Sequence, residues 1–125
     1  MATLLETLRT RLLADAPVAA LVGTKVFPLV IPQGEQPPAV VLTVVSDVPA
    51  TSLTGDPAEL LREYRVQVDT YSKRYADAQQ LAAAVGLVLG RLAEAELSAN
   101  RESARDLYDD ETQLYRVTAD FFVWQ

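Results

Sequence analysis

The chain has 125 residues, half of them apolar, and its seventeen Asp and Glu outnumber its eleven Lys and Arg to give a net charge of −6. Histidine and cysteine are both absent, which excludes the commonest general base and every Ser-His or Cys-His nucleophile pair. The length favours one domain over residues 1–125, and neither a membrane-spanning run of about twenty apolar residues nor a basic secretory signal is visible, so we expect a cytoplasmic origin.

The first residues predict two short helices. Thr3 followed by Glu6 is a capping-box pattern, and it predicts a helix over residues 4–14 with leucines recurring on one face. Asp15 can cap a second, shorter helix, and Gly23 fits a left-handed stop after it. Because the first helix is amphipathic, we expect it to cover an apolar surface.

Two strands and a long loop come next. Residues 26–31 have strand composition, but two prolines limit them to a short edge strand. Residues 39–48 are β-branched and nearly all apolar, which predicts a strand buried at the sheet centre. Residues 50–57 form a loop longer than a tight turn requires, and long loops are often functional. Its candidate contact residues are Leu53, Thr54, Gly55 and Asp56.

Residues 61–72 alternate between apolar and polar side chains, which predicts a strand with one core face. Arg65 and Asp69 lie on its other face, where we expect water or an interface. Ser72 is predicted to cap the main helix, whose apolar periodicity runs to about Leu97.

Two glycines, Gly86 and Gly90, lie one turn apart inside this helix. Each costs about 1 kcal/mol relative to alanine in a helix interior. We therefore expect close packing of the helix on the sheet at these positions.

The carboxyl-terminal part predicts a hairpin. Residues 98–102 read as a polar connection, and residues 104–108 as a strand that turns through acidic residues into the final strand. One face of the final strand is apolar, and the other is mixed. The aromatics of this mixed face are either interface anchors or are covered by the main helix or the chain terminus. The candidate residues on the mixed face are Arg116, Asp120, Phe122 and Trp124.

The order helix, strands, helix, strands predicts the fold class. It is typical of an α+β domain with helices on one side of the sheet. We expect a mainly antiparallel sheet of about four to five strands, with an N-terminal helix and one long helix packed on one side.

One acidic cluster near the predicted hairpin could bind a hard cation or supply an acid and base pair. It lacks the glycine and distal glutamate of a calcium loop, so a solvated turn is the favoured interpretation. We therefore predict no catalytic residue, no metal and no cofactor, with a small carboxylate or metal-dependent enzyme as the alternative. The cluster comprises Asp106, Asp109, Asp110 and Glu111.

The order of these segments resembles that of a known family. Ser52-Leu-Thr-Gly-Asp-Pro57 leads into Glu63-Tyr-Arg-Val-Gln-Val-Asp-Thr-Tyr-Ser72 and an alanine-rich helix, and the chain closes with the alternating segment 105–125. These stretches are similar to the tail-completion proteins of long-tailed bacteriophages, which include tail terminators and tail-to-head joining subunits. The leucine-rich first helix, Val26-Phe-Pro-Leu29 and Pro37-Pro-Ala-Val-Val-Leu42 also fit the family's order, so the resemblance covers nearly the whole chain.

This resemblance implies a non-enzymatic virion subunit at the head-proximal end of a phage tail, assembled in the host bacterial cytoplasm. Such subunits form rings, usually hexameric, that terminate the tail tube, dock the head-completion or stopper protein and leave a DNA channel. No membrane is involved. The scattered basic residues and the negative charge suit passage of DNA without specific binding. Another ring-forming head-tail adaptor of similar fold is the alternative.

Overall fold

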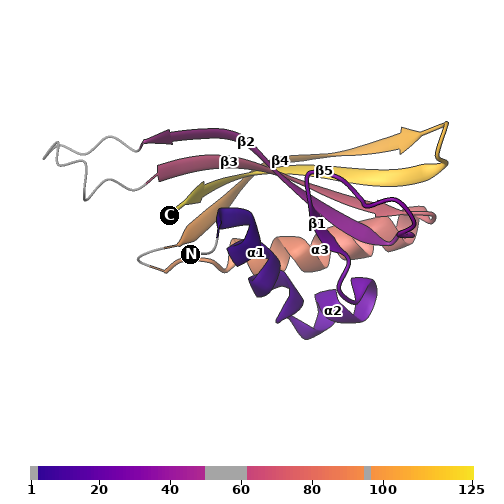
Figure 1. Cartoon of the computed structure of the whole chain (residues 1–125), viewed down its shortest axis with the longest axis horizontal. Helices are drawn as coiled ribbons and strands as arrows, with labels where there is room; N and C mark the ends of the chain where they lie inside the picture. The colour runs from indigo at the N-terminus through magenta and orange to yellow at the C-terminus, as the bar shows by residue number, and fades with distance from the viewer. Residues whose placement is uncertain (1–2, 50–61, 95–96) are drawn as a thin grey trace, which may run out of the picture.

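The computed structural model describes residues 3–49, 62–94 and 97–125. Its strands form one sheet in the order β1-β2-β3-β5-β4, in which β1 is parallel to β2 and every other neighbouring pair is antiparallel. All three helices lie on one side of this sheet (Figure 1). The predicted α+β class is confirmed. In chain order the elements are α1 (Leu4–Leu13), α2 (Ala16–Val22), β1 (Val26–Pro28), β2 (Ala39–Pro49), β3 (Arg62–Ser72), α3 (Tyr75–Gly90), β4 (Ser98–Asp109) and β5 (Leu114–Trp124).

The two N-terminal helices begin and end as their capping residues predict. In α1, the Glu6 amide donates to Thr3 Oγ1 at 3.2 Å and the Thr3 amide donates to Glu6 Oε2 at 3.3 Å. The Val18 amide donates to the Asp15 carboxylate at 3.2 Å and so caps α2. Gly23 ends α2 with a φ of 63°, a conformation that glycine adopts without a side-chain clash.

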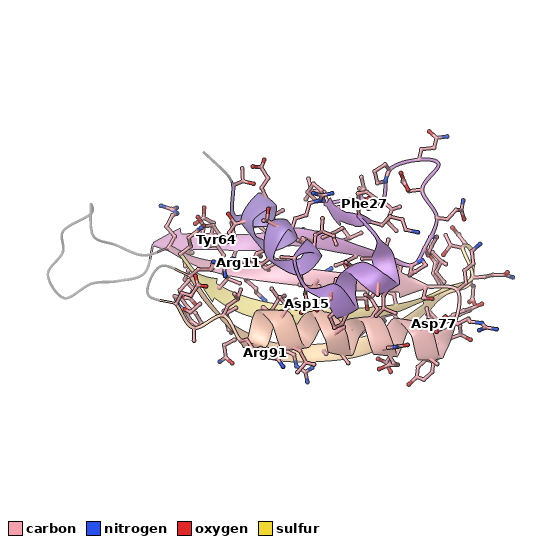
Figure 2. The ribbon with its side chains drawn as sticks, turned by 90° about the horizontal axis from the view of Figure 1, so that it is seen from below. Arg11, Asp15, Phe27, Tyr64, Asp77 and Arg91 are labelled. Carbon is pink, nitrogen blue, oxygen red and sulfur yellow. The ribbon has the colours of Figure 1, made fainter. Side chains whose placement is uncertain are left out.

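The hydrophobic core lies between the helices and one face of the sheet. In Figure 2, which views the sheet from the helix side, α3 runs beside α1 and α2. Helix α3 packs on β3, β4 and β5, while α1 packs on β1 and β2. The largest fully buried side chains are those of Phe121, Leu8, Leu12, Leu42, Leu81 and Leu89. Their removal from water is the main favourable contribution to folding.

Strand β2 is buried over only part of its length, which corrects the prediction of a central strand. Strand β1 pairs with β2 only as far as Leu42, so the rest of β2 is an edge. A bulge interrupts the pairing with β3 between Val44 and Ser46. Val45 and Val48 are 54% and 48% exposed. Apolar composition predicted burial here because it cannot show how short the neighbouring strand is.

Both predicted ends of the main helix were wrong. The N-cap is Arg74, and Ser72 accepts a hydrogen bond from its amide at 3.3 Å without capping the helix directly. The helix ends at Gly90. Neither α3 nor any other helix in the described part of the chain is long and apolar enough to cross a membrane.

The segment after α3 explains why the helical periodicity was misleading. Leu92 and Leu97 are both buried, but they reach the core from a turn. The Ala99 amide donates to the Leu92 carbonyl at 2.9 Å, so the chain doubles back immediately. Strand β4 therefore begins at Ser98, and the predicted polar connection over residues 98–102 is wrong.

The glycines of α3 do not mark close packing. A Cβ atom built at Gly86 or Gly90 would meet no atom within 4 Å. The expectation of tight packing on the sheet is therefore wrong at both positions. At Gly86 the missing side chain instead leaves open space beside the helix.

We predict that Gly86→Ala stabilises the protein by about 1 kcal/mol, because alanine restricts the unfolded chain and meets no neighbour. Gly23→Ala is the matched contrast. It should destabilise the protein, since φ at Gly23 is 63°. Denaturant unfolding of both variants measures the difference. A destabilised Gly86→Ala variant would show that α3 packs more closely than the structure has it.

Candidate interaction surfaces

One face of the sheet carries no helix and holds most of the described candidate residues. Cross-strand pairing places Arg65 opposite Phe122 and Asp69 opposite Thr118, on the side away from α1, α2 and α3. The mixed face of the last strand and the polar face of residues 61–72 therefore lie on the same side of the sheet. We call this surface the uncovered face. The candidate residues that it brings together are Arg65, Asp69, Arg116, Asp120, Phe122 and Trp124.

A hydrogen-bonded network centres on Asp69. Its Oδ1 accepts from Thr118 Oγ1 at 2.7 Å and lies 3.2 Å from Arg116 Nε. Its Oδ2 accepts from Gln67 Nε2 at 2.9 Å. Arg116 Nε also donates to Thr118 Oγ1 at 2.9 Å. The carboxylate is thus paired and hydrogen-bonded on both oxygens, as a desolvated charge requires.

Asp69 is only 4% exposed, although the sequence predicted water or an interface at this position. Its neighbours explain the burial. The Arg116 guanidinium lies 5.8 Å from the centre of the Tyr71 ring, in cation–π range. Burial, which disfavours the phenolate, raises the pKa of Tyr71. Alternation identifies the face of a residue but does not show that long neighbours cover it.

A second charged cluster lies further along the uncovered face. Arg65 Nη2 is 3.2 Å from Asp120 Oδ2 and 3.1 Å from Glu102 Oε2. Glu102 is the extra residue of a bulge in β4. Arg65 therefore joins three strands through its side chain, while remaining more than a third exposed.

Phe122 and Trp124 lie next to this cluster. Both are half-buried, and their ring centres are 6.2 Å apart. The described helices all pack on the opposite face, so the alternative in which the main helix covers these aromatics is wrong. Their role as interface anchors remains a prediction. The other candidate contact residues, Leu53, Thr54, Gly55 and Asp56, lie outside the described residues.

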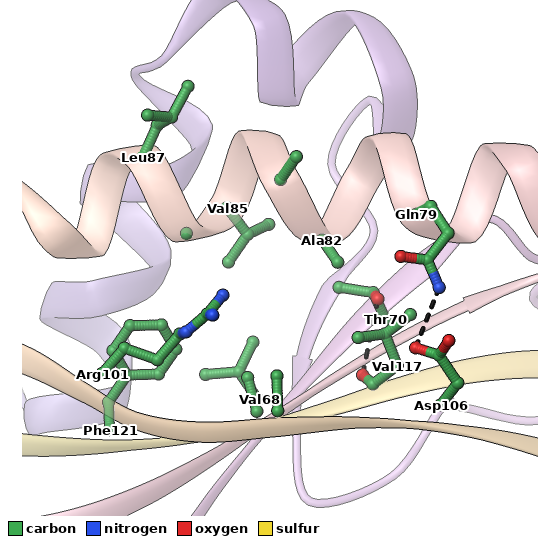
Figure 3. A pocket seen from close by; sticks show the side chains of 14 residues that line it. Val68, Thr70, Gln79, Ala82, Val85, Leu87, Arg101, Asp106, Val117 and Phe121 are labelled. Atoms are coloured by element: carbon green, nitrogen blue, oxygen red, sulfur yellow. Dashed lines mark hydrogen bonds between the residues drawn. The ribbon is translucent and has the colours of Figure 1, made fainter.

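A pocket of about 540 Å³ opens between α3 and the sheet (Figure 3). Its walls are mostly small or apolar, because alanines and Gly86 of α3 face Ala104 and Ala119 of the sheet. Arg101 lies near one end. At the other end Asp106 accepts a hydrogen bond from Gln79 Nε2 at 2.9 Å.

Sequence reasoning missed this pocket. The signal was present in the run of small residues in α3 and in the alanines of the last two strands. The spacing of Gly86 and Gly90 predicts instead that the helix packs closely on the sheet. In the structure the small residues leave a hollow, because the sheet residues opposite them are small as well.

The acidic cluster is spread over a strand and a turn. All four side chains are exposed. Asp109 Oδ1 accepts from the Glu111 amide at 3.0 Å and shapes the turn, whereas Asp106 faces Gln79 of α3. In residues 3–49, 62–94 and 97–125, no group of three or more His, Cys, Asp or Glu side chains is placed to hold a metal ion.

Comparison with known proteins gives the fold a context. The chain is similar to one in the solved structure titled "Virion of native gene transfer agent (GTA) particle", with a TM-score of 0.72 and 26% sequence identity over 97% of this chain and 92% of that chain. Nothing among the curated proteins matches the sequence. The fold and this similarity define the class as structural proteins of phage-like virions.

The family can be stated more narrowly. Residues 6–125 match the family described as "Tail completion protein gp17", and the chain belongs to that family. The resemblance to phage tail-completion proteins is therefore confirmed over almost the whole sequence.

We predict that Asp69→Ala costs about 2 kcal/mol of unfolding free energy, because it removes a buried acceptor and leaves Arg116 without its partner. Asp69→Asn, which keeps an acceptor for Thr118, should cost less. Glu102→Gln is the exposed control and should change stability by less than about 0.5 kcal/mol. Urea unfolding midpoints measure all three. Equal effects of Asp69→Ala and Glu102→Gln would contradict a stabilising role for the network.

We predict that the acidic turn has no catalytic role. Replacing Asp109, Asp110 and Glu111 together by Asn, Asn and Gln should change stability by no more than about 0.5 kcal/mol, since all three are exposed. Calorimetry with divalent cations and unfolding of the triple variant test this. A cation site or a hydrolytic activity that the substitutions abolish would show that the turn is functional.

Proposed function

We propose that the protein completes the head-proximal end of a phage tail as a ring-forming subunit, hexameric by family resemblance. In this role it terminates the tail tube and joins it to the head-completion complex. Membership of the tail-completion family and similarity to a virion chain support a structural role in the tail. The ring, its position and its partners are the proposal.

The uncovered face carries this proposal. A five-stranded sheet with helices on one side only presents a wide second surface. On it, Phe122 and Trp124 form an aromatic pair beside the charged residues Arg65 and Asp120. Aromatic residues and arginine are enriched at the centre of protein interfaces. We assign this face to contact with a neighbouring subunit or tail component.

The net charge of −6 agrees with a DNA conduit. A protein that binds DNA tightly neutralises phosphates with clustered Lys and Arg. Here two arginines of the uncovered face, Arg65 and Arg116, are each engaged by carboxylates of the same chain. The positive charges of these two arginines are therefore largely neutralised, and they attract the phosphates of a passing DNA duplex only weakly.

Native mass spectrometry of the purified protein together with complementation of a phage that lacks the gene tests the proposal. A closed oligomer and restored infectious tails are expected. Failure of the parent chain to restore tails would contradict tail completion, whatever its oligomeric state.

We predict that Phe122→Ser with Trp124→Ser weakens assembly more than folding, because the pair lies outside the core. Truncation of a central aromatic anchor typically costs 2 kcal/mol or more of binding, roughly a thirtyfold loss of affinity. The conservative pair Phe122→Leu with Trp124→Phe should retain assembly. A double-serine variant that assembles like the parent but melts far lower would place these aromatics in the folding core.

A further inference from the structure

Exposed large apolar side chains gather at the two opposite edges of the sheet. There are eight of them among the described residues, and they divide equally between the edges. One edge, formed by β1 and β2, carries Leu29, Val30, Val45 and Val48. The other, formed by β4 and the flank of α3, carries Tyr75, Leu87, Leu107 and Tyr108. We call these the β2 edge and the β4 edge.

From these two edges we propose that copies of the chain associate head to tail, with the β2 edge of one copy seated on the β4 edge of the next. In this contact Leu29 and Val30 of one copy enter the pocket between α3 and β4 of its neighbour. The inference rests on the proposed function, because it names the surfaces through which the ring would form.

The strand directions permit this contact. Strands β2, β3, β5 and β4 alternate in direction, so β2 and β4 run antiparallel to each other. Two copies related by a rotation about an axis along the strands therefore bring β4 beside β2 in the favourable antiparallel sense. Repetition of such a contact closes a ring when the rotation divides a full turn.

The apolar residues lie at the level of the pocket. The Leu29 amide donates to the Leu42 carbonyl at 2.9 Å, which fixes its height along the strands. Leu42 lies level with Val68, Val68 with Ala119, and Ala119 with Ala104. The last three residues line the pocket. A side chain that protrudes from one edge thus matches a hollow at the same height on the other.

Opposite charges on the two edges also lie close in height, about two residues along the strands from the apolar contact. The Lys25 carbonyl accepts from the Val40 amide at 3.0 Å, and Val40 lies level with Thr70, Val117 and Asp106 along the register. Val26 is the residue level with Val40, so Lys25 of one copy would lie one residue from the level of Asp106, close to the acidic turn of its neighbour. Opposite charges at similar heights fix the register of such a contact.

Leu29 supplies an independent observation. It has a φ of 69°, a conformation that leucine rarely adopts, while its side chain is 64% exposed. Strain of this kind persists where the surroundings require it and is concentrated at functional sites. Burial of the Leu29 side chain in a neighbour's pocket accounts for both its strained backbone and its exposure. Nothing in the described part of the isolated chain accounts for them.

Leu29→Gly tests this directly, because glycine relieves the strain and removes the side chain. We expect an unchanged or higher melting temperature together with at least a tenfold weaker self-association, measured by native mass spectrometry and sedimentation across a concentration series. Gln113→Gly is the matched control, since Gln113 also has a positive φ, of 57°, but lies in the β4–β5 turn. It should associate like the parent.

A mixing experiment tests the head-to-tail arrangement. Leu29→Glu blocks the β2 edge and Leu87→Glu blocks the β4 edge, so neither variant alone should form the edge-to-edge contact. Their mixture retains one intact edge of each kind and should form a one-to-one pair. The exposed substitution Ala16→Glu, on α2, controls for added charge.

A parent that stays monomeric, a Leu29→Gly variant that associates like the parent, or a mixture that forms no pair would each overturn the inference. The proposed function would then be judged by complementation alone. If the edge variants still form the parent's oligomer and restore tails, the edge contact is wrong and tail completion stands.

Discussion

The burial of only one face of the sheet is the constraint on which the rest of the structure depends. Helices α1, α2 and α3 supply apolar cover to that face, where Phe121 and the core leucines lie. The other face must satisfy its polar groups without such cover. It does so through side-chain bonds across and along the strands, in which Asp69 is bonded to Thr118 and Arg116 of β5 and to Gln67 of its own strand. Every buried side-chain nitrogen and oxygen in the described residues has a hydrogen-bond partner.

This division also separates stability from assembly. A side chain in the core cannot be changed without a cavity or strain, whereas the uncovered face and the edges contribute little to the core. Contacts with other subunits can therefore be built from residues such as Phe122 and Leu29 at small cost to folding. The family's structural role in the virion is consistent with such an arrangement.

Local chemistry made a large part of the fold predictable from the sequence. The caps at Thr3 and Asp15 and the period-two alternation of β3 and β5 depend on neighbours in the chain, and they were confirmed. The end of α3 and the start of β4 were not predictable. Leu92 and Leu97 retain helical spacing, but they are buried beyond the end of α3, where the Ala99 amide donates to the Leu92 carbonyl.

The candidate surfaces were predictable only in part. Alternation placed Phe122 and Trp124 on the correct face, because the side-chain period of a strand is independent of its partners. It did not reveal the burial of Asp69, the pocket beside Gly86 or the strained Leu29. Each of these depends on side chains or backbone brought together from distant parts of the sequence.

The bulge at Glu102 has a consequence for the fidelity of folding. Register in a sheet is normally fixed by the apolar face, since a slip of one residue would turn every side chain to the wrong side. Strand β4 is exposed from Arg101 to its end, so burial gives it little protection against such a slip. The ion pair with Arg65 is made by Glu102, the extra residue of the bulge itself. The bulge and its ion pair thus mark one register in a strand whose alignment is not fixed by hydrophobic burial.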